Sequence, residues 1–159
     1  DPALEMQAYV YANLPGENRP DVFGCQVVAN ENDEVLGENP RLLIGATRLG
    51  LHAIVKKTHE LGGLSLGCHV DRPAYGLINQ LGFIPADLAL DGVEVSRHVR
   101  LADANKAVPG IEKFSCITTS DAHFLEDIGK VRTIFQMAEP TIAEIRRSLL
   151  RQGGRRILI

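Results

Sequence analysis

The chain has 159 residues, of which 45% are hydrophobic and 23% charged, with a formal net charge of -3 and a pI near 6.0. This length suffices for one ordinary domain with its own core, and the charge excludes a broad basic surface for nucleic acid or anionic membranes, although a local arginine site is still allowed. Three cysteines without a C-x-x-C spacing argue against a disulfide framework and favour a reducing, cytoplasmic setting, and no stretch approaches the roughly 18 unbroken apolar residues of a membrane helix.

Residues 1–39 predict a helix followed by a small β-hairpin. Apolar residues recur through residues 3–14 with helical spacing. Strand-forming residues at 26–29 and 34–36 flank an acidic turn, which is typical of a hairpin. The turn's charges are explained by solvation, so we expect no chemistry here. Because the chain begins with Asp1 rather than Met, we expect it to be a piece of a longer protein.

From residue 40 onward, helical and strand patterns alternate. Residues 40–61 predict a short helix and a longer one, separated by Gly45 and Gly50. Beyond them, strands are predicted at 64–68, 90–96, 116–119, 131–135 and 156–159, helices at 75–81, 99–106, 124–128 and 141–152, and a turn at 108–110. This alternation is typical of an α/β layout with parallel strands. We therefore predict a single α/β domain over residues 1–159, in which 1–39 form an insertion and 40–159 carry the βα units.

The strand predicted at 116–119 ends in a polar run, Ser120-Asp121-Ala122-His123. Asp121 and His123 are one residue apart, so an extended backbone would direct both side chains to the same face. A carboxylate oxygen and an imidazole nitrogen could then bind one metal cluster. The alternative is that Ser120 or Asp121 caps the next helix, with His123 in its first turn.

The strand predicted at 64–68 also ends in polar residues, among them His69 and Arg72. The carboxyl ends of strands are where open and barrel-shaped α/β proteins hold their chemistry, so His69 is a candidate metal ligand. The alternative is a histidine that only forms hydrogen bonds. Arg72 offers a planar guanidinium suited to a phosphate, and a salt bridge to Asp71 or Asp91 is an equal alternative.

Four further side chains could take part in chemistry. Cys68 could bind a metal as a thiolate, but the apolar run around it favours a buried structural thiol. Glu94 points inward or toward a neighbouring strand end, or pairs with an arginine such as Arg97. His52 and His59 are seven residues apart on a predicted helix, too far for an i, i+4 metal pair. We interpret both histidines as surface or packing residues.

Taken together, these motifs resemble the later motifs of the polymerase and histidinol phosphatase (PHP) family of metal-dependent phosphoesterases. The resemblance spans roughly residues 40–150 and is carried by Leu61-Gly62-Gly63, Cys68-His69-Val70-Asp71-Arg72-Pro73, Asp91-Gly92-Val93-Glu94-Val95-Ser96-Arg97, Thr119-Ser120-Asp121-Ala122-His123 and Asp127-Ile128-Gly129. It implies a distorted seven-stranded β/α barrel, of which this chain would be the C-terminal half. The H-x-H motif and the bridging glutamate that the family carries on earlier strands are absent from this sequence.

The resemblance also implies a set of roles. His69 would bind one metal, Asp121 a second and His123 a third, in a cluster of two or three zinc, manganese or iron ions, and Arg72 would contact substrate phosphate. The cluster would activate water to hydrolyse a phosphate ester. The family commonly has Pro-Ala or similar small residues where this chain has Gly67-Cys68, which leaves open whether Cys68 alters the metal site.

One or two ligands per ion are too few for tight binding, so we expect the intact parent to be a phosphoesterase and this piece to be inactive alone. Two other functions are consistent with the motifs: a non-catalytic regulatory or interaction module, or a nuclease-like phosphodiesterase acting on short nucleic acids. The acidic charge does not favour nucleic acid. The expected partner is a small phosphorylated substrate, and the open strand edges of half a barrel predict a homodimer.

Overall fold

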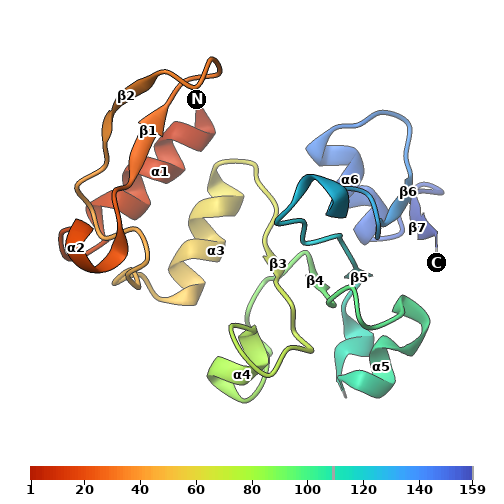
Figure 1. The fold of residues 1–159 in the computed structure, drawn as a ribbon. Helices are drawn as coiled ribbons and strands as arrows, with labels where there is room; N and C mark the ends of the chain where they lie inside the picture. Colours follow the sequence, from red (N-terminus) through yellow and green to blue (C-terminus); the bar gives the residue numbers. More distant parts are fainter. Residues whose placement is uncertain (109, 159) are drawn as a thin grey trace. The chain divides into compact units, whose positions relative to one another are not determined.

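The computed structural model describes residues 1–108 and 110–158, which divide into two units, Asp1–Lys57 and Thr58–Ile159. Figure 1 shows the order of their helices and strands along the chain. The predicted division into an insertion over 1–39 and βα units over 40–159 stays a prediction. Two predicted features include residues outside the described part: Pro109 in the turn at 108–110, and Ile159 in the last strand.

The first unit contains the predicted helix and hairpin. Helix α1 (Pro2–Ala12) begins where the Asp1 carboxylate accepts a hydrogen bond from the backbone N–H of Ala3, at 2.8 Å. A short helix, α2 (Pro20–Phe23), precedes strands β1 (Val27–Ala29) and β2 (Val35–Glu38), which pair antiparallel. The predicted N-terminal hairpin is therefore confirmed.

The predicted short helix before residue 50 is wrong, because only α3 (Leu51–Glu60) forms among residues 40–61. The Gln26 side chain forms hydrogen bonds with backbone groups in and next to the segment predicted as this helix. Its amide donates to the carbonyls of Asn39 and Arg41, and its oxygen accepts from the N–H of Leu43. Three backbone groups are thus engaged in non-helical turns.

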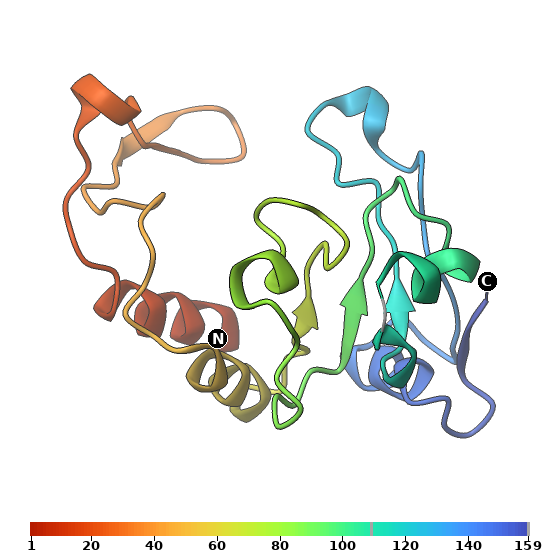
Figure 2. The same ribbon diagram turned by 90° about the horizontal axis from the view of Figure 1, so that it is seen from below.

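The second unit is built on a three-stranded parallel sheet in the order β3 (Leu66–Gly67), β4 (Gly92–Glu94) and β5 (Cys116–Ile117). Gly67 pairs with Val93, and Glu94 pairs with Ile117. Figure 2 shows the three arrows pointing the same way. The predicted parallel α/β arrangement is confirmed here, and the carboxyl ends of all three strands lie along one edge.

Short helices connect these strands and cover a small core. They are α4 (Leu77–Leu81), η1 (Leu101–Asp103), α5 (Ala104–Ala107) and η2 (Ile111–Lys113). The core gathers Val70, Val93, Val95, Ala104, Val108 and Ile111. Because Val93 and Val95 are fully buried, β4 is held at the centre of this unit on both sides of Glu94.

The C-terminal part departs from the parallel pattern. After η3 (Leu125–Asp127), strand β6 (Ile134–Gln136) pairs antiparallel with β7 (Arg156–Leu158), and α6 (Ile142–Leu149) connects them. Within residues 1–108 and 110–158 the strands form three separate sheets and no closed barrel. The seven-stranded barrel stays a prediction. No helix in this described part is long and apolar enough to cross a membrane.

Candidate metal centre

The candidate site lies where the three parallel strands end. Cys68 and His69 follow β3, Glu94 is the last residue of β4, and Asp121 lies four residues after β5. The ladder continues past the strands, since the N–H of Val70 donates to the carbonyl of Glu94 at 2.9 Å. Segments far apart in the sequence therefore meet at one edge, as predicted from their polar strand ends.

The backbone is strained at two of the predicted ligands. His69 has a φ of 42° and Asp121 a φ of 47°, the left-handed region that residues other than glycine rarely adopt. The extended backbone that we assumed around Asp121 is therefore wrong. Such strain persists where surrounding contacts hold it, and it is frequent at functional sites. Here it brings the two side chains together, with His69 Nε2 3.5 Å from Asp121 Oδ1.

The imidazole of His69 lies between two carboxylates. Its Nδ1 atom is 3.5 Å from Glu94 Oε2, while Nε2 faces Asp121. The side chain is only 12% exposed, and Nδ1 is buried without a hydrogen-bond partner. A buried polar nitrogen without a hydrogen bond costs free energy, so a group that engages it would stabilise this arrangement.

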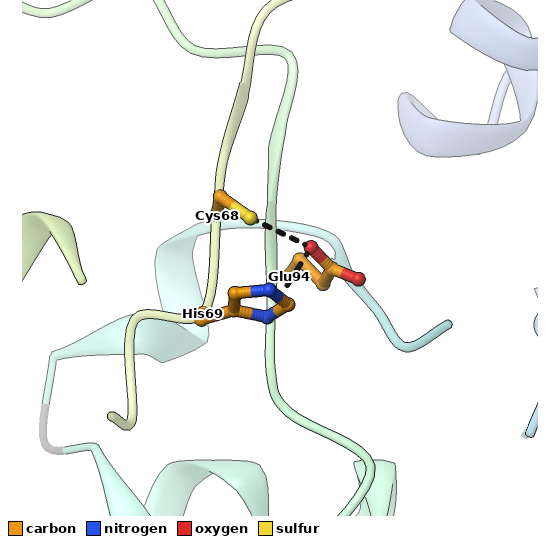
Figure 3. Close-up of side chains that lie close together, drawn as sticks. All are labelled: Cys68, His69 and Glu94. Carbon is orange, nitrogen blue, oxygen red and sulfur yellow. Dashed lines mark hydrogen bonds and ion pairs between the residues drawn. The ribbon is translucent and has the colours of Figure 1, made fainter. Parts of the chain in front are cut away.

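Glu94 is a site residue that we did not select from the sequence. Its buried carboxylate accepts a hydrogen bond from Cys68 Sγ at 3.1 Å and one from Thr119 Oγ1 at 2.5 Å. Arg97, the partner we considered for it, lies instead 3.5 Å from Asp127. The signal in the sequence was its place at the end of an alternating, β-rich run. Figure 3 shows Glu94 facing Cys68 and His69.

Cys68 is exposed, so the preferred interpretation of a buried structural thiol is wrong. Its thiol nevertheless points at Glu94. Partial burial of the sulfur, the hydrogen bond to Glu94 and the carboxylate's negative charge together raise the pKa of Cys68 to about 12. At neutral pH the thiol is therefore protonated and can donate its hydrogen to the carboxylate.

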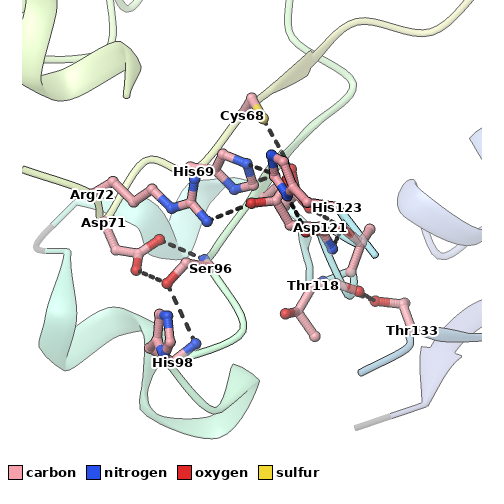
Figure 4. A network of polar contacts seen from close by, with 12 residues as sticks. Cys68, His69, Asp71, Arg72, Ser96, His98, Thr118, Asp121, His123 and Thr133 are labelled. Carbon is pink, nitrogen blue, oxygen red and sulfur yellow. Dashed lines mark hydrogen bonds and ion pairs between the residues drawn. The ribbon is translucent and has the colours of Figure 1, made fainter. Parts of the chain in front are cut away.

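Arg72 is held at the site by Asp121. Its Nη2 atom donates to Asp121 Oδ2 at 2.6 Å, and this hydrogen bond keeps the pKa of Asp121 below its usual range. The alternative of a salt bridge to Asp71 or Asp91 is not what forms. Asp71 instead accepts hydrogen bonds from the N–H and the hydroxyl of Ser96, at 2.6 and 2.5 Å. Figure 4 shows both contacts within one polar network.

His123 is exposed beside Asp121. Its Nδ1 atom lies 2.9 Å from the backbone carbonyl of Asp121, so the ring is oriented with Nε2 on the opposite side. The structure thus brings His69, Asp121 and Arg72 into contact and places His123 next to them. Their roles as metal ligands and substrate contact stay predictions.

The remaining predicted histidine roles concern α3. His59 Nε2 lies 2.8 Å from Asp91 Oδ2. The same carboxylate accepts hydrogen bonds from the Ser65 N–H and from Arg146. This contact agrees with the interpretation of His59 as a packing residue.

One set of donor atoms is compact enough for a single ion. Among the described residues, Cys68, His69 and Glu94 each offer a ligand atom, and these atoms all lie within 4.8 Å of one another. Sulfur, imidazole nitrogen and carboxylate oxygen are all common ligands of divalent transition ions. The side chains at this edge therefore fit a metal centre chemically.

Comparisons with known proteins concern the family and the fold of this chain. A family model described as PHP-associated matches residues 113–152, which include Asp121 and His123. A solved structure, that of the lesion-specific endonuclease PfuEndoQ from Pyrococcus furiosus, is similar with a TM-score of 0.58 and 25% identity. The alignment covers 71% of this chain and 29% of the endonuclease. No curated protein sequence matches the chain significantly.

Proposed function

Because this chain carries the C-terminal part of a PHP domain, we propose that it supplies part of the metal centre of a metal-dependent phosphoesterase. The observation that carries the proposal is the convergence of His69 and Asp121, 3.5 Å apart at the ends of parallel strands and both in strained left-handed backbone. Strain at two chemically active side chains is better explained by a site than by folding alone.

The proposed ligands are His69 Nε2, the Asp121 carboxylate and His123. They would hold two or three zinc, manganese or iron ions together with further ligands. A divalent ion bound there would lower the pKa of a bound water toward neutrality and stabilise the negative charge that develops on a phosphate. The mixture of imidazole and carboxylate suits such ions.

Glu94 has a supporting role in this proposal. A metal-binding histidine commonly donates its other ring N–H to a carboxylate, which fixes the tautomer and the ring orientation. Glu94 Oε2 lies 3.5 Å from His69 Nδ1, on the side of the ring away from Asp121. With the hydrogen on Nδ1, the ring would present the lone pair of Nε2 toward the proposed cluster.

Arg72 is the proposed phosphate contact. One of its terminal nitrogens is bound to Asp121, and a guanidinium has five N–H donors in all. When Asp121 binds an ion, its carboxylate is less available to Arg72, and the guanidinium can turn to the oxygens of a phosphate. A planar, permanently charged donor is well suited to that task.

The described residues provide one or two ligands per ion, so we propose that the remaining ligands come from other parts of a longer protein. The chain spans 29% of the length of the similar endonuclease, which leaves room for them. The 159-residue chain alone would then hydrolyse no phosphate ester at a measurable rate. Its three free cysteines favour a reducing compartment, and we place the protein in the cytoplasm.

The test is to assay the complete gene product that contains this chain, loaded with Zn²⁺ or Mn²⁺, on a generic phosphomonoester. We expect H69Q and D121N each to lower kcat by at least about 100-fold, because each removes a ligand. The matched control is H98Q, since His98 is exposed and donates to Ser96 through its backbone N–H, which the substitution keeps. Unchanged activity in H69Q and D121N would instead support a regulatory or interaction module.

A nuclease-like phosphodiesterase is the second candidate, favoured by the similarity to a solved endonuclease. The same metal chemistry cleaves phosphodiesters, so the ligands alone do not choose between the two substrates. Assaying the complete protein with short oligonucleotides beside the phosphomonoester separates them. Cleavage of the oligonucleotides with no monoester hydrolysis would replace the phosphatase proposal with the nuclease one.

A further inference from the structure

His69 presents two different sets of neighbours, one on each ring nitrogen. Nε2 faces Asp121, while Nδ1 faces the carboxylate of Glu94, which also accepts a hydrogen bond from the thiol of Cys68. We propose that Cys68, His69 Nδ1 and Glu94 form a second ion site, for one thiolate-binding divalent ion of the zinc class. This inference concerns atoms that the proposed phosphoesterase centre does not use as ligands, and it does not depend on that activity.

The first support is the spacing of the donor atoms. Tetrahedral zinc with ordinary bond lengths separates a nitrogen and an oxygen ligand by about 3.4 Å, and a sulfur and an oxygen ligand by about 3.6 Å. His69 Nδ1 lies 3.5 Å from Glu94 Oε2, and Cys68 Sγ lies 3.1 Å from the same oxygen. All three donor atoms lie within 4.8 Å of one another, so side-chain movements that bring the sulfur and the imidazole nitrogen onto one ion would complete three of its four positions. The fourth position is left for water or a further ligand.

The second support is the unsatisfied nitrogen. His69 Nδ1 is buried and has no hydrogen-bond partner, although the Glu94 carboxylate lies beside it. Glu94 Oε2 instead accepts from the Cys68 thiol. An ion between the three groups would bind Nδ1 and take the place of the thiol hydrogen, so that Cys68 and His69 both stay next to Glu94. The proton of the thiol would be released to solvent.

The third support is charge and chemical preference. A thiolate and a carboxylate together carry two negative charges, which balance a divalent ion in a partly buried site. Thiolate and imidazole are ligands that zinc prefers over manganese or magnesium. Cys68 would therefore make this edge of the sheet prefer zinc over manganese or magnesium more strongly than histidines and carboxylates alone would.

The two proposed sites compete for His69. A neutral imidazole has one nitrogen with a hydrogen and one with a free lone pair, so it binds an ion through either Nδ1 or Nε2. An ion held with Cys68 and Glu94 leaves Nε2–H directed at Asp121. Loading of the thiolate site would thus withdraw His69 from the cluster beside Asp121.

The experiment is a Co²⁺ titration of the 159-residue chain, followed by the sulfur-to-cobalt charge-transfer absorption that only a thiolate ligand gives. We expect one equivalent of Co²⁺ to produce this band and Zn²⁺ to displace it. C68S should abolish the band, and E94Q should weaken Co²⁺ binding by at least about tenfold. The matched control C25S should retain it, because Cys25 is an exposed cysteine in the other unit.

D121N distinguishes this site from the proposed phosphoesterase centre, because it should leave the band intact while activity in the complete protein is lost. A band that survives in C68S, or one that D121N abolishes, would overturn the inference. Alkylation of the wild-type chain gives an answer even if C68S does not fold. Under conditions in which iodoacetamide labels Cys68 in the metal-free chain, Zn²⁺ should protect Cys68 and not Cys25. Equal rates of Cys68 labelling with and without Zn²⁺ under those conditions would also overturn it.

Discussion

The hydrogen bonds between Asp71 and Ser96 connect the loop after β3 to the segment that follows β4. Asp71 accepts from the N–H of Ser96 at 2.6 Å and from its hydroxyl at 2.5 Å. These two hydrogen bonds join segments 25 residues apart. Because Asp71 lies between His69 and Arg72, we expect its loss to affect both stability and metal binding.

The magnitude follows from the partners. Hydrogen bonds to a charged group contribute about 1.5–3 kcal/mol each, and partial exposure of Asp71 to solvent reduces this. D71A should therefore lower the free energy of unfolding by about 2–3 kcal/mol, since it also leaves the N–H of the buried Ser96 without its acceptor. S96A removes the hydroxyl's hydrogen bond to Asp71 and its longer one from the His98 N–H at 3.4 Å, and it should cost about 1 kcal/mol.

Urea unfolding of the 159-residue chain, followed by far-ultraviolet circular dichroism, measures these values. Each single variant loses the hydrogen bond from the Ser96 hydroxyl to Asp71. The cost of the double variant D71A/S96A should therefore be about 1 kcal/mol smaller than the sum of the two single costs. Co²⁺ affinity should weaken in the order wild type, S96A, D71A. Strict additivity of the two substitutions, or a D71A cost below about 0.5 kcal/mol, would refute the reasoning.

Three further predictions concern stability and assembly. The pKa of Glu144 is lowered to about 2 by its hydrogen bonds from Arg155 and the Ala138 N–H. The stability that these bonds contribute should be present above the ordinary pKa of 4.5 and lost as the pH falls toward 2. Urea unfolding midpoints should therefore fall over that pH range in the wild-type chain and vary less in E144Q. G76A would place a Cβ atom 2.5 Å from the His69 carbonyl, so urea unfolding should show a loss of about 1–3 kcal/mol, while G50A, with no atom within 4 Å, should change little. Light scattering should find the 159-residue chain dimeric through its open strand edges, and a monomer at high concentration would contradict this.

The strands that carry the site could be predicted from local composition. Apolar runs ending in polar residues, β-branched in the case of β5, located β3 and β5, and parallel pairing then placed His69 and Asp121 at one edge. The start of α6 was also predictable, because Thr141 and Glu144 have the spacing of a capping box. Thr141 is indeed the N-cap, and its hydroxyl accepts from the Glu144 N–H. The other half of that capping box does not form, since the Glu144 carboxylate binds Arg155 and Ala138 instead.

Contacts over long sequence separations were beyond the reach of pattern analysis. Glu94 meets Cys68 across 26 residues and Thr119 across 25, so its neighbours in the sequence gave no indication of either. The same holds for Arg72, for which a salt bridge to Asp71 or Asp91 was the alternative and whose partner is Asp121, 49 residues away. Local patterns identify which residues end a strand, and tertiary packing decides which of them meet.

The left-handed backbone at His69 and Asp121 could not be predicted from the sequence either. Because this conformation costs free energy, contacts with distant residues are needed to stabilise it. Each such residue costs roughly 1–2 kcal/mol relative to a relaxed conformation. The Asp71–Ser96 and Arg72–Asp121 hydrogen bonds tie down these two loops and are of a size to offset that cost. The side chains at the strand ends are therefore held in place by protein contacts alone, so an ion would bind a site that is already arranged and would lose little free energy in ordering it.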